Sequence, residues 1–108
     1  MREEKNIITT DDEGLEFALG TQRLFTLRWQ DVSEIVAYKE DLFGCDSVCI
    51  AFRTSQTGDY VRVFEEAEGY REMLDALEVR FPGMRKDWFN EVAFPAFVPN
   101  WTTLWRTS

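Results

Sequence analysis

The hydrophobic period of the chain changes once, near residue 65, and this change limits the folds open to it. In residues 14–20, "GLEFALG", apolar side chains occupy every second position, which is the period of a strand with one buried face. The run 23–29, "RLFTLRW", repeats this alternation after Gly20, Thr21 and Gln22. The two runs therefore predict a β-hairpin.

Further strands follow in the same half of the chain. The segment 34–40, "EIVAYKE", continues the alternation less cleanly, and 47–54, "SVCIAFRT", is apolar on both faces, as in a central strand. A polar link then offers Gly58 for a positive φ, so that 60–64, "YVRVF", folds back on the preceding strand. These segments predict an antiparallel meander.

The later residues follow a helical period. One apolar stripe has spacings of 3, 4, 3 and 4 and consists of Tyr70, Met73, Leu74, Leu77 and Phe81. We expect Glu65, Glu66 and Glu68 at the positive end of this helix, Arg80 in its last turn, and Pro82-Gly83 beyond its end. A second, short helix is expected to begin near Asp87.

The length of the chain fits one domain. With 108 residues, it can bury roughly 65% of the surface that the unfolded chain exposes, which is enough for a core without metal or disulfide. Strands followed by a helix predict an α+β domain over residues 1–108. We expect a core over about 5–81 and a C-terminal extension, 82–108, packed on it.

The order of segments resembles the pleckstrin-homology-like (PH-like) fold, in particular its small bacterial and GRAM-type members. The resemblance covers about residues 5–81 and depends on the meander, on Trp29, Val32 and Ile35 in "RWQDVSEIVAY", and on the single helix. It implies a half-barrel of two sheets whose end is capped by the amphipathic helix. The basic hairpin with which family members hold phosphoinositides is absent, and the tail after Gly83 has no counterpart in that fold.

The net charge disfavours several classes of partner. Twenty acidic and twelve basic residues give a formal charge of -8, and no segment concentrates Lys and Arg. Such a field repels phosphate backbones and anionic lipid head groups, so we expect no binding to nucleic acid or membranes, whereas a basic partner is attracted. Residues 1–12 lack the apolar core of a secretion signal, and no segment has the apolar length of a membrane span. The sequence thus favours a cytoplasmic protein.

The sequence carries no recognised motif for catalysis or cofactor binding. Cys45 and Cys49 have a spacing unlike zinc knuckles or redox pairs, and the chain contains no His, so we expect no metal and interpret Cys49 as a buried strand residue. The Glu65, Glu66 and Glu68 cluster is explained by the helix dipole, and 11–13, "DDE", by a turn. The sequence therefore predicts no catalytic residue and no cofactor.

The segment 92–105, "VAFPAFVPNWTTLW", contains no ionisable side chain, although 30% of the whole chain is charged. We expect it to be desolvated, and favour docking on its own domain over an interface with another chain. Pro95 and Pro99 exclude a regular helix or a central strand there. If partly exposed, Trp101 and Trp105 are the expected interface anchors, because Trp is enriched in binding hot spots.

Arginines on the predicted strands complete the candidate binding residues. Arg28, Arg53 and Arg62 could share a solvent face and bind a carboxylate or phosphate, although pairing with Glu16 or Glu34 is the simpler interpretation. The functional hypothesis is a non-enzymatic PH-like module that binds a protein or peptide. Two alternatives are an immunity- or inhibitor-type protein that neutralises a basic partner and an enzyme with an atypical carboxylate site. A homodimer is also compatible with the sequence.

Overall fold

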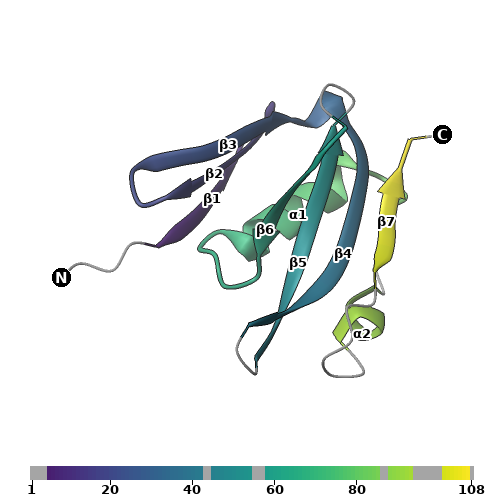
Figure 1. Cartoon of the computed structure of the whole chain (residues 1–108). Helices are drawn as coiled ribbons and strands as arrows, with labels where there is room; N and C mark the ends of the chain where they lie inside the picture. Colours follow the sequence, from purple (N-terminus) through teal and green to yellow (C-terminus); the bar gives the residue numbers. More distant parts are fainter. Residues whose placement is uncertain (1–4, 43–44, 55–57, 86–87, 94–100, 108) are drawn as a thin grey trace.

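The computed structural model describes residues 5–42, 45–54, 58–85, 88–93 and 101–107 (Figure 1). They form a small α+β protein with antiparallel sheets, as the order of sequence patterns predicted. Its elements in chain order are β1 (Asn6–Thr10), β2 (Gly14–Leu19), β3 (Gln22–Arg28), the 3-10 turn η1 (Trp29–Asp31), β4 (Val32–Leu42), β5 (Cys45–Thr54), β6 (Tyr60–Phe64), α1 (Tyr70–Arg80), α2 (Trp88–Ala93) and β7 (Thr102–Arg106).

The first sheet has the strand order β1-β2-β3. The predicted hairpin joins β2 to β3, and Gly20 takes the positive φ of 61° in its turn. The preceding turn is held by Asp11, whose carboxylate accepts the backbone N–H groups of Glu13 and Gly14 at 2.9 Å. These hydrogen bonds, that from Gly14 first, lower the pKa of Asp11. The acidic run 11–13 is therefore a turn, as predicted.

The second sheet has the strand order β6-β5-β4-β7. As predicted, β5 is a central strand that lies between β4 and β6, and Cys49 is buried. The fold-back of β6 on β5 also agrees with the sequence, and Gly58 takes a positive φ of 75° before it. Figure 1 shows α1 lying across one face of the second sheet, behind β5 and β6. Met73 and Leu77 of α1 belong to the core on that side.

Helix α1 ends as predicted but begins later. It ends at Arg80, and Phe81 caps it before Pro82. It begins at Tyr70, because Gly69 takes a φ of 89° and interrupts the helical backbone. The glutamates at 65, 66 and 68 therefore lie in the turn before the helix, and the helix begins one or more residues after the start that they were expected to mark.

Two of these glutamates bind β5 instead of the helix end. The Glu65 carboxylate accepts the backbone N–H of Val48 at 2.9 Å, and that of Glu66 accepts the Ser47 hydroxyl at 2.7 Å. The third contributes its backbone, since the Glu68 carbonyl accepts the N–H of Ile8 at 2.7 Å. These bonds connect the turn before α1 to both sheets.

The hydrophobic core lies between the inner faces of the sheets and α1. Phe17 comes from the first sheet, Ile35 and Phe52 come from the second, and Met73 and Leu77 come from α1. Met73 and Leu77 are fully buried, so the 3,4-spaced stripe faces the sheets as predicted. Burial at roughly 25 cal/mol per Å² of apolar area makes this contact the main source of helix stability.

The C-terminal part adds α2 and a seventh strand. β7 pairs antiparallel with β4 at the edge of the second sheet. Leu104 is buried in the main core, and its carbonyl accepts the backbone N–H of Arg85 at 3.0 Å. The short helix expected near residue 87 is present as α2. The expectations for Phe94, Pro95, Phe97 and Pro99 concern residues outside the described ranges.

Candidate functional site

The outer face of the second sheet carries a small apolar cluster of its own. Side chains alternate along a strand, so β4 directs Ile35 and Ala37 into the core and Val36 and Tyr38 to the opposite face. There they join Cys49 and Ala51 from β5, and all four residues of this cluster are buried. Large side chains must therefore cover this face.

Trp101 provides part of that cover. Its ring stacks on the ring of Tyr38 with a centroid distance of 4.1 Å and an interplanar angle of 11°. It precedes β7, whose pairing with β4 brings it over Tyr38. Tyr38 is buried, whereas Trp101 is 60% exposed. Trp101 thus packs through one face of its indole while much of the side chain remains accessible to solvent.

Arg62 approaches the same tyrosine from β6. Its Nη1 donates a hydrogen bond to the Tyr38 hydroxyl at 2.9 Å and lies 3.3 Å from a carboxylate oxygen of Glu40. The guanidinium also lies 5.5 Å from the centre of the Phe64 ring. Burial raises the pKa of Tyr38, and the bond from Arg62 offsets part of that rise. The tyrosine is therefore neutral at physiological pH.

Arg53 is held in a similar way on β5. Its Nη1 lies 3.8 Å from the carboxylate of Glu34, and its guanidinium lies 5.9 Å from the centre of the Tyr60 ring. The Tyr60 hydroxyl donates to the same carboxylate at 2.7 Å, and this bond raises the pKa of Tyr60. Arg106 of β7 is opposite Glu34 in register, which places it on this face of the sheet.

We call this surface the aromatic–arginine face. Its exposed residues include Arg53, Tyr60, Arg62, Trp101, Thr103 and Arg106. Three of the five candidate binding residues of the sequence, Arg53, Arg62 and Trp101, thus share one surface. The pairing of Arg53 with Glu34 agrees with the simpler interpretation of that arginine, whereas Arg62 pairs with Glu40.

The structure separates the other two candidates from this surface. Trp105 is half-buried and packs edge-to-face on Phe81 at a centroid distance of 4.6 Å, on the core side of the sheet. Arg28 ends β3 in the first sheet. Tyr38 was not among the candidates from the sequence, although the alternation through "EIVAYKE" directs it to the face opposite that of Ile35 and Ala37.

The cysteine on this face is not an active thiol. Cys49 is fully buried and free, and burial, with a smaller contribution from Glu40, raises its pKa to about 11. The thiol is thus protonated at neutral pH and is a poor nucleophile. Within the described part of the chain, no three His, Cys, Asp or Glu side chains are grouped to hold a metal ion.

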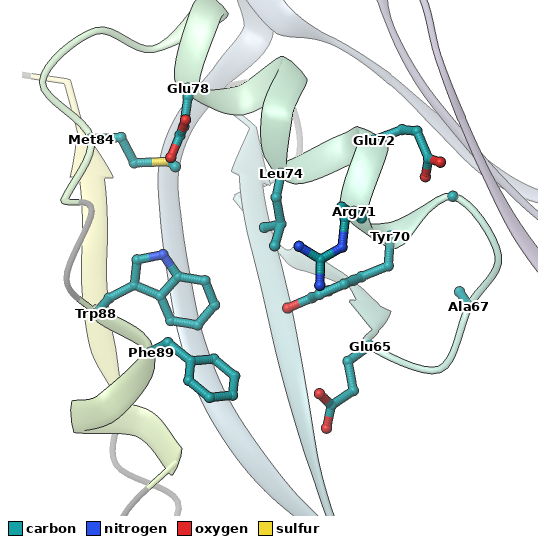
Figure 2. Close-up of a pocket in the computed structure, with 11 residues that line it drawn as sticks. Glu65, Ala67, Tyr70, Arg71, Glu72, Leu74, Glu78, Met84, Trp88 and Phe89 are labelled. Atoms are coloured by element: carbon teal, nitrogen blue, oxygen red, sulfur yellow. The ribbon is translucent and has the colours of Figure 1, made fainter.

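A concave surface lies between α1 and α2, apart from the aromatic–arginine face (Figure 2). This groove has a volume of about 700 Å³. Its lining residues come from both helices and their flanking turns: Glu65, Ala67, Gly69, Tyr70, Arg71, Glu72, Leu74, Glu78, Met84, Trp88 and Phe89. It shares no lining residue with the aromatic–arginine face.

Tyr70 is the unusual side chain of the groove. Its hydroxyl is buried and has no hydrogen-bond partner among the described residues. Burial, and then the negative charge of Glu65, raise the pKa of Tyr70 well above its usual value. The hydroxyl therefore remains protonated, and its hydrogen-bonding capacity is unused.

No family model, curated protein or solved structure matches this chain. Within the described residues, neither helix has the length and apolar character required to cross a membrane. The functional interpretation therefore depends on the chemistry of the aromatic–arginine face and of the groove.

Proposed function

We propose that this chain is a non-enzymatic protein- or peptide-interaction module that binds its partner through the aromatic–arginine face. The observation that carries the proposal is Trp101, which is 60% exposed although it stacks on a buried tyrosine. Trp, Tyr and Arg are the residue types enriched in binding hot spots, and this face presents all three. A partner that covers Trp101 would bury on the order of 100 Å² of aromatic surface.

The two central arginines are already ordered before a partner binds. Arg53 and Arg62 each lie over an aromatic ring and beside a carboxylate, which limits the rotamers that their side chains can adopt. Immobilising a free side chain on binding costs about 0.5 to 1.5 kcal/mol, so this ordering favours affinity. The side chains remain about half exposed, at 48% and 50%, and can donate further hydrogen bonds.

The chemistry of the face favours a protein over a polyanion. Its arginines are partly neutralised by Glu34 and Glu40, and the whole chain carries a formal charge of -8. A phosphate backbone or an anionic membrane would therefore gain little attraction here. Mixed charge around an exposed aromatic side chain suits a folded protein surface or an extended peptide. We place the module in the cytoplasm, where a free thiol such as Cys49 stays reduced.

We further propose that the scaffold is a PH-like half-barrel on which the C-terminal tail docks. Support for the half-barrel comes from sheets of three and four antiparallel strands, from the meander β1 to β6 and from α1 directly after it. The pairing of β7 with β4 and the burial of Leu104 support docking of the tail. In this arrangement the tail supplies the main anchor of the interface.

Photo-crosslinking tests the proposed surface. A p-benzoyl-phenylalanine in place of the exposed Thr103, beside Val36 on the same face, should give a discrete crosslink in native lysate. The same probe in place of the exposed Leu24, on the first sheet, is the control and should not give that product. Trp101→Ala and Arg62→Ala should each reduce the crosslink by about tenfold, the loss expected for a hot-spot side chain.

Circular dichroism would confirm that each variant keeps its fold. A crosslink at position 103 that survives both substitutions would refute the proposed surface, because the partner would then not depend on its anchors. A crosslink that forms equally from position 24 would show that the contact has no preference for this face.

A further inference from the structure

The groove between α1 and α2 has an apolar wall on each side. Leu74 projects from α1, and Trp88 and Phe89 project from α2, with Met84 between the helices (Figure 2). Trp88 is buried and packs edge-to-face with Phe89 at a centroid distance of 5.8 Å, whereas Phe89 is half exposed. These walls suit an aliphatic chain that packs between Leu74 on one side and the aromatic rings of Trp88 and Phe89 on the other.

The charged residues of the groove are mainly acidic. Glu65, Glu72 and Glu78 are among its lining residues, and Arg71 is the one cation among the described residues that line it. The formal charge of the lining is thus negative, in a chain whose overall charge is also negative. A cationic occupant is therefore attracted both at long range and at contact.

The buried hydroxyl of Tyr70 provides a third, independent indication of a ligand. Figure 2 shows the ring of Tyr70 extending from α1 with its hydroxyl directed toward the side of the groove formed by Trp88 and Phe89. An unsatisfied buried polar group costs about 1 to 3 kcal/mol, so a donor that reached this oxygen would relieve a cost already present in the free protein.

We propose that this groove binds an arginine side chain of a partner protein. The aliphatic stem lies between Leu74 and Phe89, and the guanidinium stacks on the aromatic wall and donates to the carboxylates. A small rotation of the Tyr70 ring on binding brings its buried hydroxyl oxygen within reach of the same guanidinium. Arginine fits better than lysine because its planar cation stacks on rings and donates in several directions at once. The inference concerns a site separate from the aromatic–arginine face and would hold for an adaptor or for an inhibitor of a basic protein.

Peptide binding to the intact chain tests the inference. The probe is a fluorescein-labelled pentapeptide, acetyl-Ala-Leu-Arg-Leu-Ala, measured by fluorescence anisotropy. The same peptide with citrulline in place of arginine keeps the shape but removes the charge, and should bind at least about tenfold more weakly. Raising the salt concentration from about 50 to 500 mM should weaken the binding of the arginine peptide and leave the affinity of the citrulline peptide little changed.

Variants of the lining then assign the contacts. Glu78→Gln and Glu72→Gln should weaken binding, whereas the charge-matched control Asp75→Asn, on α1 but outside the groove, should not. Tyr70→Phe should weaken the binding of the arginine peptide without altering the fold. Arg71→Gln should tighten binding, because it removes a repulsive positive charge from the lining.

Several outcomes would overturn the inference. Equal binding of the citrulline peptide would show that charge is not recognised, and equal effects of Asp75→Asn and Glu78→Gln would show only a nonspecific field. If a peptide with glutamate in place of the arginine bound more tightly than the arginine peptide, and bound more weakly to the Arg71→Gln variant, the groove would be assigned to anions. Absence of saturable binding of the arginine peptide to a correctly folded protein would refute the site.

Discussion

Leu77 offers a quantitative test of the packing between α1 and the sheets. Its side chain is fully buried in the core that both sheets share. Leu77→Ala removes three carbon atoms, which at about 0.8 kcal/mol each corresponds to about 2.4 kcal/mol of lost transfer free energy. The cavity left in the core cluster adds about 1 to 2 kcal/mol, since close-packed neighbours relax only in part. We expect a loss of about 3 to 4 kcal/mol.

Urea unfolding followed by tryptophan fluorescence measures this change. The urea concentration at the unfolding midpoint should fall, while the slope of the unfolding free energy against urea concentration stays constant. The melting temperature should fall by at least about 10 °C. Val79→Ala is the matched control, because Val79 lies on the same helix and is 77% exposed. Its effect should be within about 0.5 kcal/mol of zero. A Leu77→Ala midpoint no lower than that of the control would refute the placement of the helix.

Three further predictions concern the backbone, the thiol and the tail. Gly69→Ala should lower the melting temperature more than Gly83→Ala, because both positions have a positive φ but only a Cβ at position 69 would collide with a backbone oxygen; equal shifts would contradict this. Cys49 should resist a thiol reagent at pH 8 until the protein is unfolded. Since folding raises the pKa of this thiol from 9.0 to about 11, its contribution to stability is present below pH 9 and is lost as the pH rises toward 11, and a rise in stability over that range would contradict the burial. Truncation after Glu91 should lower the melting temperature markedly, because it removes β7 and buried Leu104; an unchanged value would identify the tail as an interaction arm.

The local sequence was sufficient to predict the strands and the helix that bury one regular face. The alternation in β2 and β3, with Gly20 between them, specified a hairpin because side chains on a strand alternate between two faces. The stripe that includes Met73 and Leu77 specified α1 and its buried side for the same kind of reason. Pro82 fixed the end of that helix, since proline cannot continue it.

The start of α1 was not a local property. A favourable interaction of acidic residues with the helix dipole contributes only about 0.3 to 1 kcal/mol. Here Glu65 and Glu66 instead satisfy groups of β5, and Gly69 fits where the backbone passes close to Ile8. Contacts between distant segments therefore outweighed the local preference.

The first and last strands also depend on distant partners. Residues 6–10 show no alternation, and they form β1 through hydrogen bonds to β2 and to the turn before α1. The tail was expected to be desolvated, but its composition did not show that β4 offers the edge with which β7 pairs. Backbone pairing of this kind leaves little trace in side-chain patterns.

The candidate surfaces were also predicted only in part from the sequence. The sequence by itself selected Trp101, Arg53 and Arg62 from their residue types and their places on predicted strands. Only the tertiary structure placed Trp101 on Tyr38, 63 positions earlier in the chain, and brought α2 beside α1 to form the groove. Local periodicity records which face of a segment is buried, whereas the choice of neighbour depends on sheet order and on packing between segments far apart in the chain.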